Sequence, residues 1–476
     1  MNEWYLVHDE YFLPSDQIIE RGIYLWNFKL TQHYKMKNIS ILFILTLFLT
    51  SSTGPVKIYE WRGPDRSGIY PESNLLKEWP AEGPRELWSI KNIGNGFVSP
   101  VFTGENFYIT GEIDSMEILF SFNLKGEKQW QTTLGREWTK SFPGSRSAPT
   151  IVGDLLYVGT GLGNLYCVNR ANGRILWSKD LVTDFNGALP LHGHSESALI
   201  CEEKIFWTTG GKINNVVALN RFTGKLIWSN KGFGERSAYN SPKLIELPAR
   251  KIMVTFSAYH LMGFDIATGN LLWSHEQDNY PPDKRIPGNG DTHSNTILYE
   301  KGSIYYTAGD GNCGVKLKLS DDGTKITEVW RNKSFDSFMG GIVKIGDYIY
   351  GSGTVKPELL GINSSTGVLT DSLRVGSGAI ISADNMLYYY TQKGDMMLLS
   401  CNNGKIEKVS SFRIKEGTLQ HFSHPVIHNG VLYQRHGNVL MAFSLQIATG
   451  LDYGKCHSPD QSAHREYLFR QSSRYR

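Results

Sequence analysis

The chain of 476 residues has only five cysteines, and they are widely separated: Cys167, Cys201, Cys313, Cys401 and Cys456. An odd number at such spacings defines no disulfide framework. The sequence also has no adjacent cysteine pair and no Cys-x-x-Cys-His, the motif that attaches a c-type haem. Cysteines such as Cys167 and Cys401, which fall on expected strands, are most simply small core residues.

Several catalytic motifs are missing as well. No Gly-x-Ser-x-Gly nucleophile elbow, Walker loop, Rossmann turn after a strand or His-Glu-x-x-His zinc motif occurs in the right context. The formal net charge is only +3, which is too small to indicate a nucleic-acid partner. These absences argue against a hydrolase, a nucleotide-dependent enzyme and a nucleic-acid-binding protein.

The amino-terminal region lacks an apolar run of about 20 residues, the length of a membrane-spanning helix. Its apolar run, Ile39–Leu49, follows Met36-Lys37-Asn38 and precedes small residues up to Gly54, as in a secretory signal. We expect translation to begin at Met36, residues 1–35 to be a non-native extension, residues 36–54 to be the signal, and the protein to be periplasmic or extracellular. The alternative is an uncleaved signal-anchor with residues 1–35 in the cytoplasm.

What the chain does contain is a repeated sequence motif made of Asn or Asp, a glycine and a closing tryptophan. Clear copies are Asn169–Trp177, Asn220–Trp228 and Asp265–Trp273, and weaker ones surround Gly126, Gly323, Gly367 and Gly404. The Asn or Asp side chain can hydrogen-bond the backbone of the turn, and glycine supplies the positive φ of a tight hairpin. Such four-strand units in series indicate a β-propeller, with the tryptophans packed between blades.

The repeat divides the chain into eight units: 99–130, 148–177, 197–228, 241–273, 296–330, two that begin near Gly341 and Ala379, and a last one at 424–444. The last unit has no outer strand of its own. Arg85–Ile90, which contains Trp88, supplies the missing strand from upstream and would close the ring without an open edge. The sequence therefore predicts an all-β, eight-bladed β-propeller of four-stranded blades over residues 55–446, with seven blades as the next alternative.

Two sequence patterns resemble a known family. Gly163-x-Leu-x-x-x-Asn-x-x-x-Gly-x-x-x-Trp177 resembles the repeat of PQQ-like (pyrroloquinoline-quinone-like) propellers, and Trp61-Arg-Gly-Pro-Asp-Arg-Ser-Gly68 resembles the opening segment of their bacterial secreted members. The resemblance implies one of two function classes. Quinoprotein dehydrogenases hold PQQ and usually Ca²⁺ on the propeller axis, whereas BamB-like proteins are non-enzymatic scaffolds of outer-membrane protein assembly. The fold alone does not choose between them.

The chain departs from both classes at one point each. Many quinoprotein alcohol dehydrogenases carry two adjacent cysteines beside the quinone, and this chain has no such pair. No cysteine stands directly after the apolar run either, so a lipid anchor of the BamB kind is not indicated.

Candidate ligand-binding residues follow from the start of each innermost strand, because these strands line the central channel and one alternating set of side chains should face its mouth. Aligning the units places a histidine at one position of blades three, five and eight, namely His194, His293 and His421. Two residues further on, and on the same face, lie Ser147, Glu196, Asn240 and Asn295. With Asp291, these residues predict a polar site at the channel mouth, facing blades with little side-chain bulk.

The histidines could ligate Zn²⁺ or Cu²⁺ with help from Glu196 or Asp291. Metal ligands must approach within about 2.0–2.2 Å, and non-adjacent blades are far apart, so we expect no metal site. Ca²⁺ with PQQ would require Glu196, Asn240, Asn295 and Asp291 to converge, and no flanking motif anchors that match. Arg146, Arg236 and Arg285 precede blades two, four and five, where they either pair with an anionic ligand or are simply solvated.

We therefore expect a monomeric, non-enzymatic scaffold without catalytic residues. It would bind a protein partner at the cell envelope or a small ligand in its funnel, would not bind nucleic acid, and would contact a membrane only through an uncleaved anchor. The alternative is a PQQ-dependent oxidoreductase that oxidises an alcohol or a sugar. The polar stretch 447–476 carries four arginines and is either a solvated tail or a basic docking arm.

Overall fold

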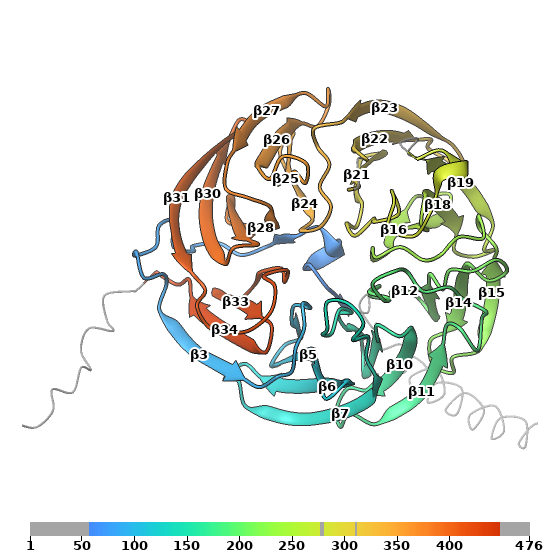
Figure 1. Ribbon diagram of the computed structural model, residues 1–476, viewed down its shortest axis with the longest axis horizontal. Helices are drawn as coiled ribbons and strands as arrows, with labels where there is room; N and C mark the ends of the chain where they lie inside the picture. Colours follow the sequence, from blue (N-terminus) through green and yellow to red (C-terminus); the bar gives the residue numbers. More distant parts are fainter. Residues whose placement is uncertain (1–56, 277–279, 310–311, 448–476) are drawn as a thin grey trace, which may run out of the picture. The chain divides into compact units, whose positions relative to one another are not determined.

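The computed structural model describes residues 57–276, 280–309 and 312–447, so the expectations for residues 1–54 and for the tail beyond Ile447 lie outside it. The described part forms eight β-sheets arranged as the blades of a ring (Figure 1), and this confirms the eight-bladed β-propeller. None of the helices in this part is long and apolar enough to span a membrane.

In blades one to seven four consecutive strands form a meander that runs outward from the axis, and blade eight combines three such strands with one from upstream (Figure 1). Blades one to four consist of β4 (Val101–Phe102), β5 (Asn106–Ile113), β6 (Met116–Asn123) and β7 (Lys128–Arg136); β8 (Thr150–Val152), β9 (Leu155–Gly159), β10 (Asn164–Asn169) and β11 (Ile175–Asp180); β12 (Leu199–Cys201), β13 (Lys204–Trp207), β14 (Val216–Asn220) and β15 (Leu226–Asn230); and β16 (Lys243–Glu246), β17 (Lys251–Phe256), β18 (His260–Asp265) and β19 (Leu271–Glu276).

Blades five to seven consist of β20 (Leu298–Glu300), β21 (Ser303–Thr307), β22 (Gly314–Leu319) and β23 (Ile326–Asn332); β24 (Ile342–Ile345), β25 (Tyr348–Ser352), β26 (Leu359–Asn363) and β27 (Leu369–Leu373); and β28 (Gly378–Ala383), β29 (Met386–Thr391), β30 (Asp395–Asn402) and β31 (Lys405–Arg413). Blade eight consists of β32 (Val426–His428), β33 (Val431–His436), β34 (Val439–Ser444) and, from the amino-terminal side, β3 (Glu86–Lys91).

The repeated sequence motif forms the hairpin between the third and fourth strands of a blade. In blade three the Asn220 Oδ1 atom accepts the backbone N–H groups of Phe222 and Thr223, each at 3.1 Å. Gly224 then adopts a φ of +68°, which a residue with a Cβ adopts only with strain. The side chain that opens the turn and the glycine that ends it therefore fix the hairpin locally, before any packing between blades.

The closing tryptophans join neighbouring blades. In each case the indole Nε1–H donates to a backbone carbonyl in or beside the turn of the next blade, at 3.0–3.2 Å: Trp88 to Leu124, Trp130 to Arg170, Trp177 to Arg221, Trp228 to Ile266, Trp273 to Gly323, and Trp330 to Ser364. The predicted inter-blade packing is confirmed for Trp130, Trp177, Trp228, Trp273 and Trp330. Because each indole satisfies its one polar group there, the rest of its ring can be buried between sheets.

The ring is closed by strand β3, as the sequence predicts. It pairs antiparallel with β34, and Trp88 lies opposite Ala442. The Trp88 ring also stacks on Phe107 of blade one, with 6.0 Å between ring centroids. Strand β3, which precedes blade one in the sequence, therefore completes the last blade and contacts the first, so that the ring is not left with an unpaired outer edge on blade eight.

The amino-terminal segment 57–70, here called the axial segment, crosses the centre of the ring (Figure 1). Its first strand, β1 (Ile58–Tyr59), pairs antiparallel with β8 of blade two. After a short 3₁₀ helix, η1 (Pro64–Arg66), its second strand, β2 (Ile69–Tyr70), pairs parallel with β28 of blade seven. From the sequence, only the innermost strands of the blades are expected to line the channel. That expectation was incomplete, because these two sheets gain a fifth strand from the axial segment.

Two buried arginines fasten the axial segment to the blades. The Arg66 guanidinium donates to the carbonyl oxygens of Ser197, Ala198 and Pro242 at 2.8–2.9 Å, which ties blade three to blade four. Its Nε also contacts the Glu60 carboxylate at 2.6 Å.

Arg62 fastens the axial segment to blades six and eight. It donates to the Ile342 carbonyl of blade six at 2.9 Å and lies 3.1 Å from Nδ1 of His424 in blade eight. Burial lowers the pKa of the Arg62 guanidinium to about 10, so it remains charged at neutral pH. Four blades are therefore linked through two side chains at the axis.

We expect Gly269→Ala to lower the stability of the ring by about 1–3 kcal/mol, the usual magnitude for a residue held in the left-handed region. Gly269 has a φ of +76°, and an added Cβ would lie 2.6 Å from the ring of Trp228. Thermal unfolding followed by circular dichroism measures the change. Gly104→Ala is the matched control, because it also adds one methyl group but meets nothing within 4 Å; equal melting temperatures for the two variants would contradict the prediction.

Candidate functional site

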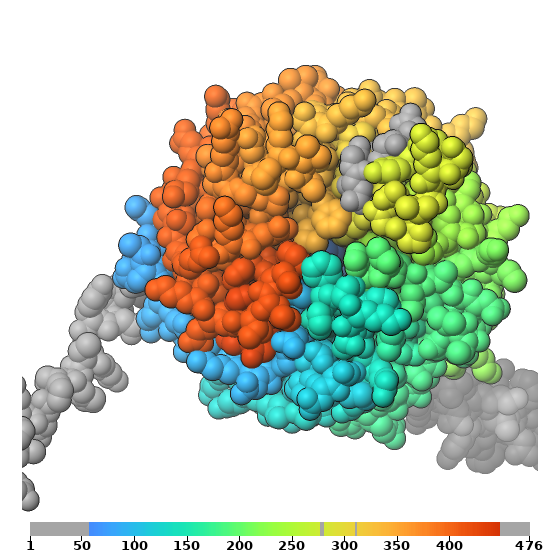
Figure 2. Space-filling view, in the orientation of Figure 1, coloured from blue at the N-terminus to red at the C-terminus, as the bar shows by residue number. Residues whose placement is uncertain are grey.

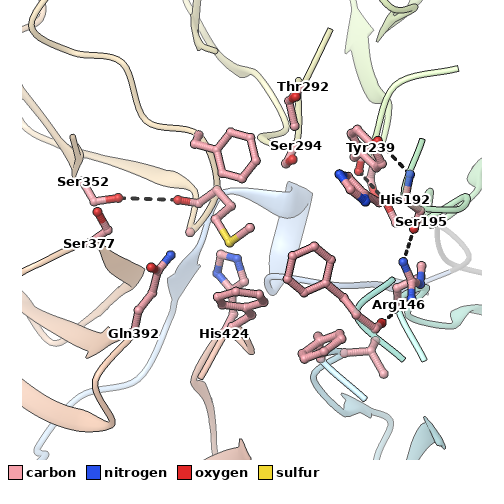
Figure 3. Close-up of a pocket in the computed structure, with 18 of the residues that line it drawn as sticks. Arg146, His192, Ser195, Tyr239, Thr292, Ser294, Ser352, Ser377, Gln392 and His424 are labelled. Carbon is pink, nitrogen blue, oxygen red and sulfur yellow. Dashed lines mark hydrogen bonds between the residues drawn. The ribbon is translucent and has the colours of Figure 1, made fainter. Parts of the chain in front are cut away.

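A cavity of about 610 Å³ opens on the axis, where the segments leading into the innermost strands meet. The space-filling view is hollowed near the centre of the ring (Figure 2), and the close-up shows side chains from several blades around the cavity (Figure 3). Its size falls within the range of about 300–1,000 Å³ that is typical of small-molecule sites. The ring therefore encloses a ligand-sized space above the axial segment's Trp61, whose ring contacts His424 edge-on at 5.0 Å between centroids.

The lining combines rings with hydroxyl groups. The aromatic side chains, together with one thioether, are Trp61, Phe97, Phe142, His192, Tyr239, Phe338, Met339, Phe422 and His424. The hydroxyl side chains are Ser195, Ser197, Ser241, Thr292, Ser294, Ser352, Thr354 and Ser377. Arg146 is the one arginine or lysine among the described lining residues, and no aspartate or glutamate lines the cavity there. An apolar wall with a few polar groups that set orientation is typical of a binding site.

Arg146 is held firmly at the edge of this cavity. Its guanidinium donates to the carbonyl oxygens of His192 and Phe142, and its Nε lies 3.6 Å from Oε1 of the buried Glu137. Burial lowers the pKa of the Arg146 guanidinium and raises that of the Glu137 carboxyl. Of the three arginines that sequence analysis considered for an anionic ligand, only Arg146 lines the cavity; Arg236 pairs with Asp291 and Arg285 with Glu276.

The three predicted histidines do not converge. His194 is fully buried and its Nε2 lies 3.1 Å from the Thr208 carbonyl of its own blade. His293 stacks on Phe256 with 4.5 Å between ring centroids, and His421 stacks on His436 at 3.7 Å. Burial lowers the pKa of each of these histidines to about 4, so all three are neutral at physiological pH. They are held apart in separate contacts instead of sharing one funnel.

The predicted polar partners also face the blades. Both carboxylate oxygens of Glu196 accept the Thr208 N–H at 3.1 Å, and burial raises the pKa of Glu196 to about 8. Asn295 donates to the Ser337 carbonyl at 2.9 Å and accepts the Gly341 N–H at 2.8 Å, so it joins blade five to blade six.

The other three predicted residues also bond to groups outside the cavity or are buried. Asn240 accepts the Phe256 N–H at 3.3 Å, and the Asp291 carboxylate pairs with Arg236. Ser147 is buried, at 1% exposure. None of the eight predicted residues is among those that line the cavity.

In blades three, four and five the residues that line the cavity lie one position away from the predicted ones. Ser195, Tyr239 and Ser294 line the cavity, and each is adjacent in sequence to a predicted residue. Successive side chains of an extended chain point to opposite sides, so a displacement of one residue exchanges the two faces. The expected orientation is therefore corrected, while a ligand-binding role for the eight residues themselves stays a prediction.

The residues present do not fit PQQ with Ca²⁺. Ca²⁺ takes six to eight oxygen ligands, usually including carboxylates, and the described lining offers no carboxylate. Glu196, Asn240, Asn295 and Asp291, the expected oxygen donors, bond to backbone groups or to Arg236. Within the described residues no group of three or more His, Cys, Asp and Glu side chains could hold a metal ion. The groups that the described lining offers a ligand are therefore mainly rings and hydroxyls.

These features define a PQQ-like propeller with an aromatic cavity on its axis. Residues 115–370 match the family model described as outer membrane protein assembly factor BamB, and the chain belongs to this family. It is 22% identical over 373 residues to the outer membrane protein assembly factor BamB of Yersinia pestis, covering 73% of this chain and 82% of that protein.

Two solved structures share the fold. BamB from Moraxella catarrhalis superposes with a TM-score of 0.55 at 15% identity, covering 77% of this chain and 98% of that one. A europium-containing methanol dehydrogenase superposes with a TM-score of 0.57 at 9% identity, covering 80% and 90%. At such identities the likeness concerns the fold alone, so the site has to be interpreted from its own residues.

Proposed function

We propose that this protein is a non-enzymatic scaffold that binds protein partners at the cell envelope, in the periplasm or outside the cell. The observation that carries the proposal is the match to the BamB family over more than half of the chain. The BamB of Yersinia pestis, whose length is matched over 82%, is by name an assembly factor for outer membrane proteins. The resemblance of residues 36–54 to a secretory signal supports the same compartment.

The outer surface of the ring suits such a role. Neighbouring outer strands expose large apolar side chains, with Ile175 and Leu176 of β11 38–39% exposed and Leu226 and Ile227 of β15 46–51% exposed. An outermost strand also presents backbone groups that a partner strand or loop can pair with. Because the blades are joined by the tryptophan contacts and the axial arginines, this surface is rigid, which reduces the entropy lost on binding.

A PQQ-dependent oxidoreductase is the second candidate that the resemblance offers, but the arrangement of side chains does not favour it. Substrate oxidation would require a base and a metal-bound quinone on the axis. The axis here carries Arg62, Arg66 and the aromatic cavity instead.

We expect a photo-crosslinking amino acid at Leu226, introduced in the organism that produces the protein, to yield an adduct with a defined envelope protein of the outer-membrane assembly machinery. Mass spectrometry of the adduct identifies that protein. Val355, which is 76% exposed in a loop of blade six, is the matched control and should not yield the same adduct.

The scaffold proposal would be contradicted if the protein behaved as an oxidoreductase. If Leu226 gave no adduct while the purified protein retained one equivalent of PQQ with Ca²⁺ and oxidised alcohols with an artificial acceptor, the scaffold proposal would be wrong. Retention of the quinone would also raise the melting temperature, because a ligand that binds only the folded state stabilises it.

A further inference from the structure

We propose that the axial cavity is a binding site for an uncharged or anionic aromatic group. This activity is separate from the scaffold role of the outer surface, and neither depends on the other. The observations that carry it are an arc of rings on one side of the cavity, a strained and exposed phenylalanine in that arc, hydroxyl groups without partners, and a lining without carboxylates.

The arc consists of five rings in sequence around the cavity wall. The centroid distances are 5.5 Å from Phe97 to Phe422, 6.1 Å from Phe422 to Phe142, 5.4 Å from Phe142 to His192, and 6.2 Å from His192 to Tyr239. All of these fall within the 4.5–7 Å range of favourable ring pairs. A ring placed in the cavity would extend this series, and Phe338 and Met339 of blade six line the cavity as well. Thioether sulfur also contacts aromatic rings favourably.

Phe142 is the member of the arc that the fold alone explains least. Its side chain is 42% exposed although it belongs to the arc, and its φ is +48°. A non-glycine residue in this region is strained by about 1–3 kcal/mol, and such strain concentrates at ligand-binding positions. Arg146 holds the residue in place by donating to its carbonyl oxygen. The loop is therefore fixed so that an apolar ring stands at the cavity, where a bound ring would cover it.

The polar groups define the rest of the ligand. Among the described residues, the side chains of Thr292, Ser294 and Gln392 line the cavity and have no hydrogen-bond partner; Figure 3 shows Thr292 and Ser294 on one side and Gln392 on another. These groups can bond a carbonyl, hydroxyl or amide of a ligand. Arg146 lines the cavity, whereas its partner Glu137 is buried and does not. A cation in the cavity would therefore meet the guanidinium and no lining carboxylate, so a cationic ligand is disfavoured.

Three probes that carry the same indole ring but differ in charge test this selectivity: N-acetyltryptophanamide, which is neutral, N-acetyltryptophan, which is anionic, and tryptamine, which is cationic. We expect the purified protein to bind the first two at one site per chain in isothermal titration calorimetry, and tryptamine at least tenfold more weakly. N-acetylcyclohexylalanine amide, which has a saturated ring, should bind more weakly than the aromatic amide. The peptide acetyl-Gly-Trp-Gly-amide shows whether the aromatic group belongs to a free small molecule or to a polypeptide side chain.

Phe142→Gly separates binding from folding. The substitution removes the ring but suits a positive φ, so we expect about tenfold weaker binding of N-acetyltryptophanamide with an unchanged or higher melting temperature. Phe222→Ala is the matched control: Phe222 is 47% exposed on the outer hairpin of blade three, and its loss should leave binding unchanged. As a second variant, Thr292→Val should weaken binding while keeping the shape of the side chain.

The proposal is wrong if the neutral and anionic probes fail to saturate, if tryptamine binds as well as they do, or if Phe142→Gly and Phe222→Ala have equal effects. Displacement of the probes by a methyl glycoside of similar affinity would likewise overturn it in favour of a carbohydrate site. Each of these results leaves the Leu226 crosslink unaffected, so failure here is distinguishable from failure of the scaffold proposal.

Discussion

Arg66→Ala is expected to destabilise the protein by about 3–5 kcal/mol, the magnitude seen when one partner of a buried charged contact is removed. The Arg66 side chain is 1% exposed and bonds three carbonyl oxygens at the axis, those of Ser197, Ala198 and Pro242. Its removal would leave the Ser197 and Pro242 carbonyls buried without these donors and Glu60 without its partner, while the Ala198 carbonyl would keep only the Thr150 hydroxyl. Chemical denaturation at neutral pH measures the loss as a lower midpoint.

Two further variants test this explanation. Arg66→Lys keeps the charge, but a single ammonium group cannot reproduce the planar fork of donors, so most of the loss should remain. Arg374→Ala removes an arginine whose side chain is 91% exposed and paired with Glu358; exposed pairs contribute little, and the midpoint should not move. If Arg66→Ala unfolded at the same midpoint as Arg374→Ala, the axial segment would not be fastening blades three and four.

The blades could be predicted from sequence because their information is local. Asn220 and Gly224 determine a hairpin within five residues of chain, and Trp228 marks the strand that follows. The closure by β3 could be predicted for a similar reason, because the last unit lacks an outer strand and Trp88 marks a strand without a unit. Local chemistry repeated along the chain thus predicts the global architecture.

The axial segment carries no such pattern. Its two strands have two residues each, too few to show alternation, and between them Arg62, Asp65 and Arg66 adopt positive φ without being glycine. Only the resemblance of Trp61–Gly68 to the opening segment of a family marks it in the sequence. The positions of Arg62 and Arg66 depend on carbonyl groups more than 130 residues away, and a single sequence does not display those contacts.

The candidate site illustrates a different limit. Both alternating sets at the blade starts contain polar residues, since Ser195 and Ser294 are as polar as His194 and Asn295. Hydrophobic alternation therefore does not identify the face that meets the channel. What distinguishes the sets is hydrogen bonding: Glu196 satisfies a backbone N–H within its blade, whereas Ser294, among the described residues, has no side-chain partner. The feature that could have found the cavity in the sequence is the aromatic residue adjacent to the aligned position, as in Phe97, Tyr239 and Phe422.

Removing the amino-terminal segments should have the largest effect of all. A chain that begins at Asn92 lacks both the axial segment and β3, so blade eight would keep three strands and expose the unpaired edge of β34. A long exposed edge strand pairs with other molecules, and we expect this truncation to form soluble aggregates or to precipitate. Size-exclusion chromatography with light scattering measures the outcome.

A second truncation separates closure from axial fastening. A chain that begins at Pro71 lacks Arg62 and Arg66 but keeps β3, whose residues Trp88 and Ile90 pair with Ala442 and Leu440. We expect it to stay monomeric, because the ring is still closed, but to melt at a lower temperature, because the carbonyl groups at the axis lose their donors. If the chain from Asn92 were instead a monomer that melts cooperatively, β3 would not be what closes the ring. Aggregation of both chains to the same extent would place closure in the axial segment instead of in β3.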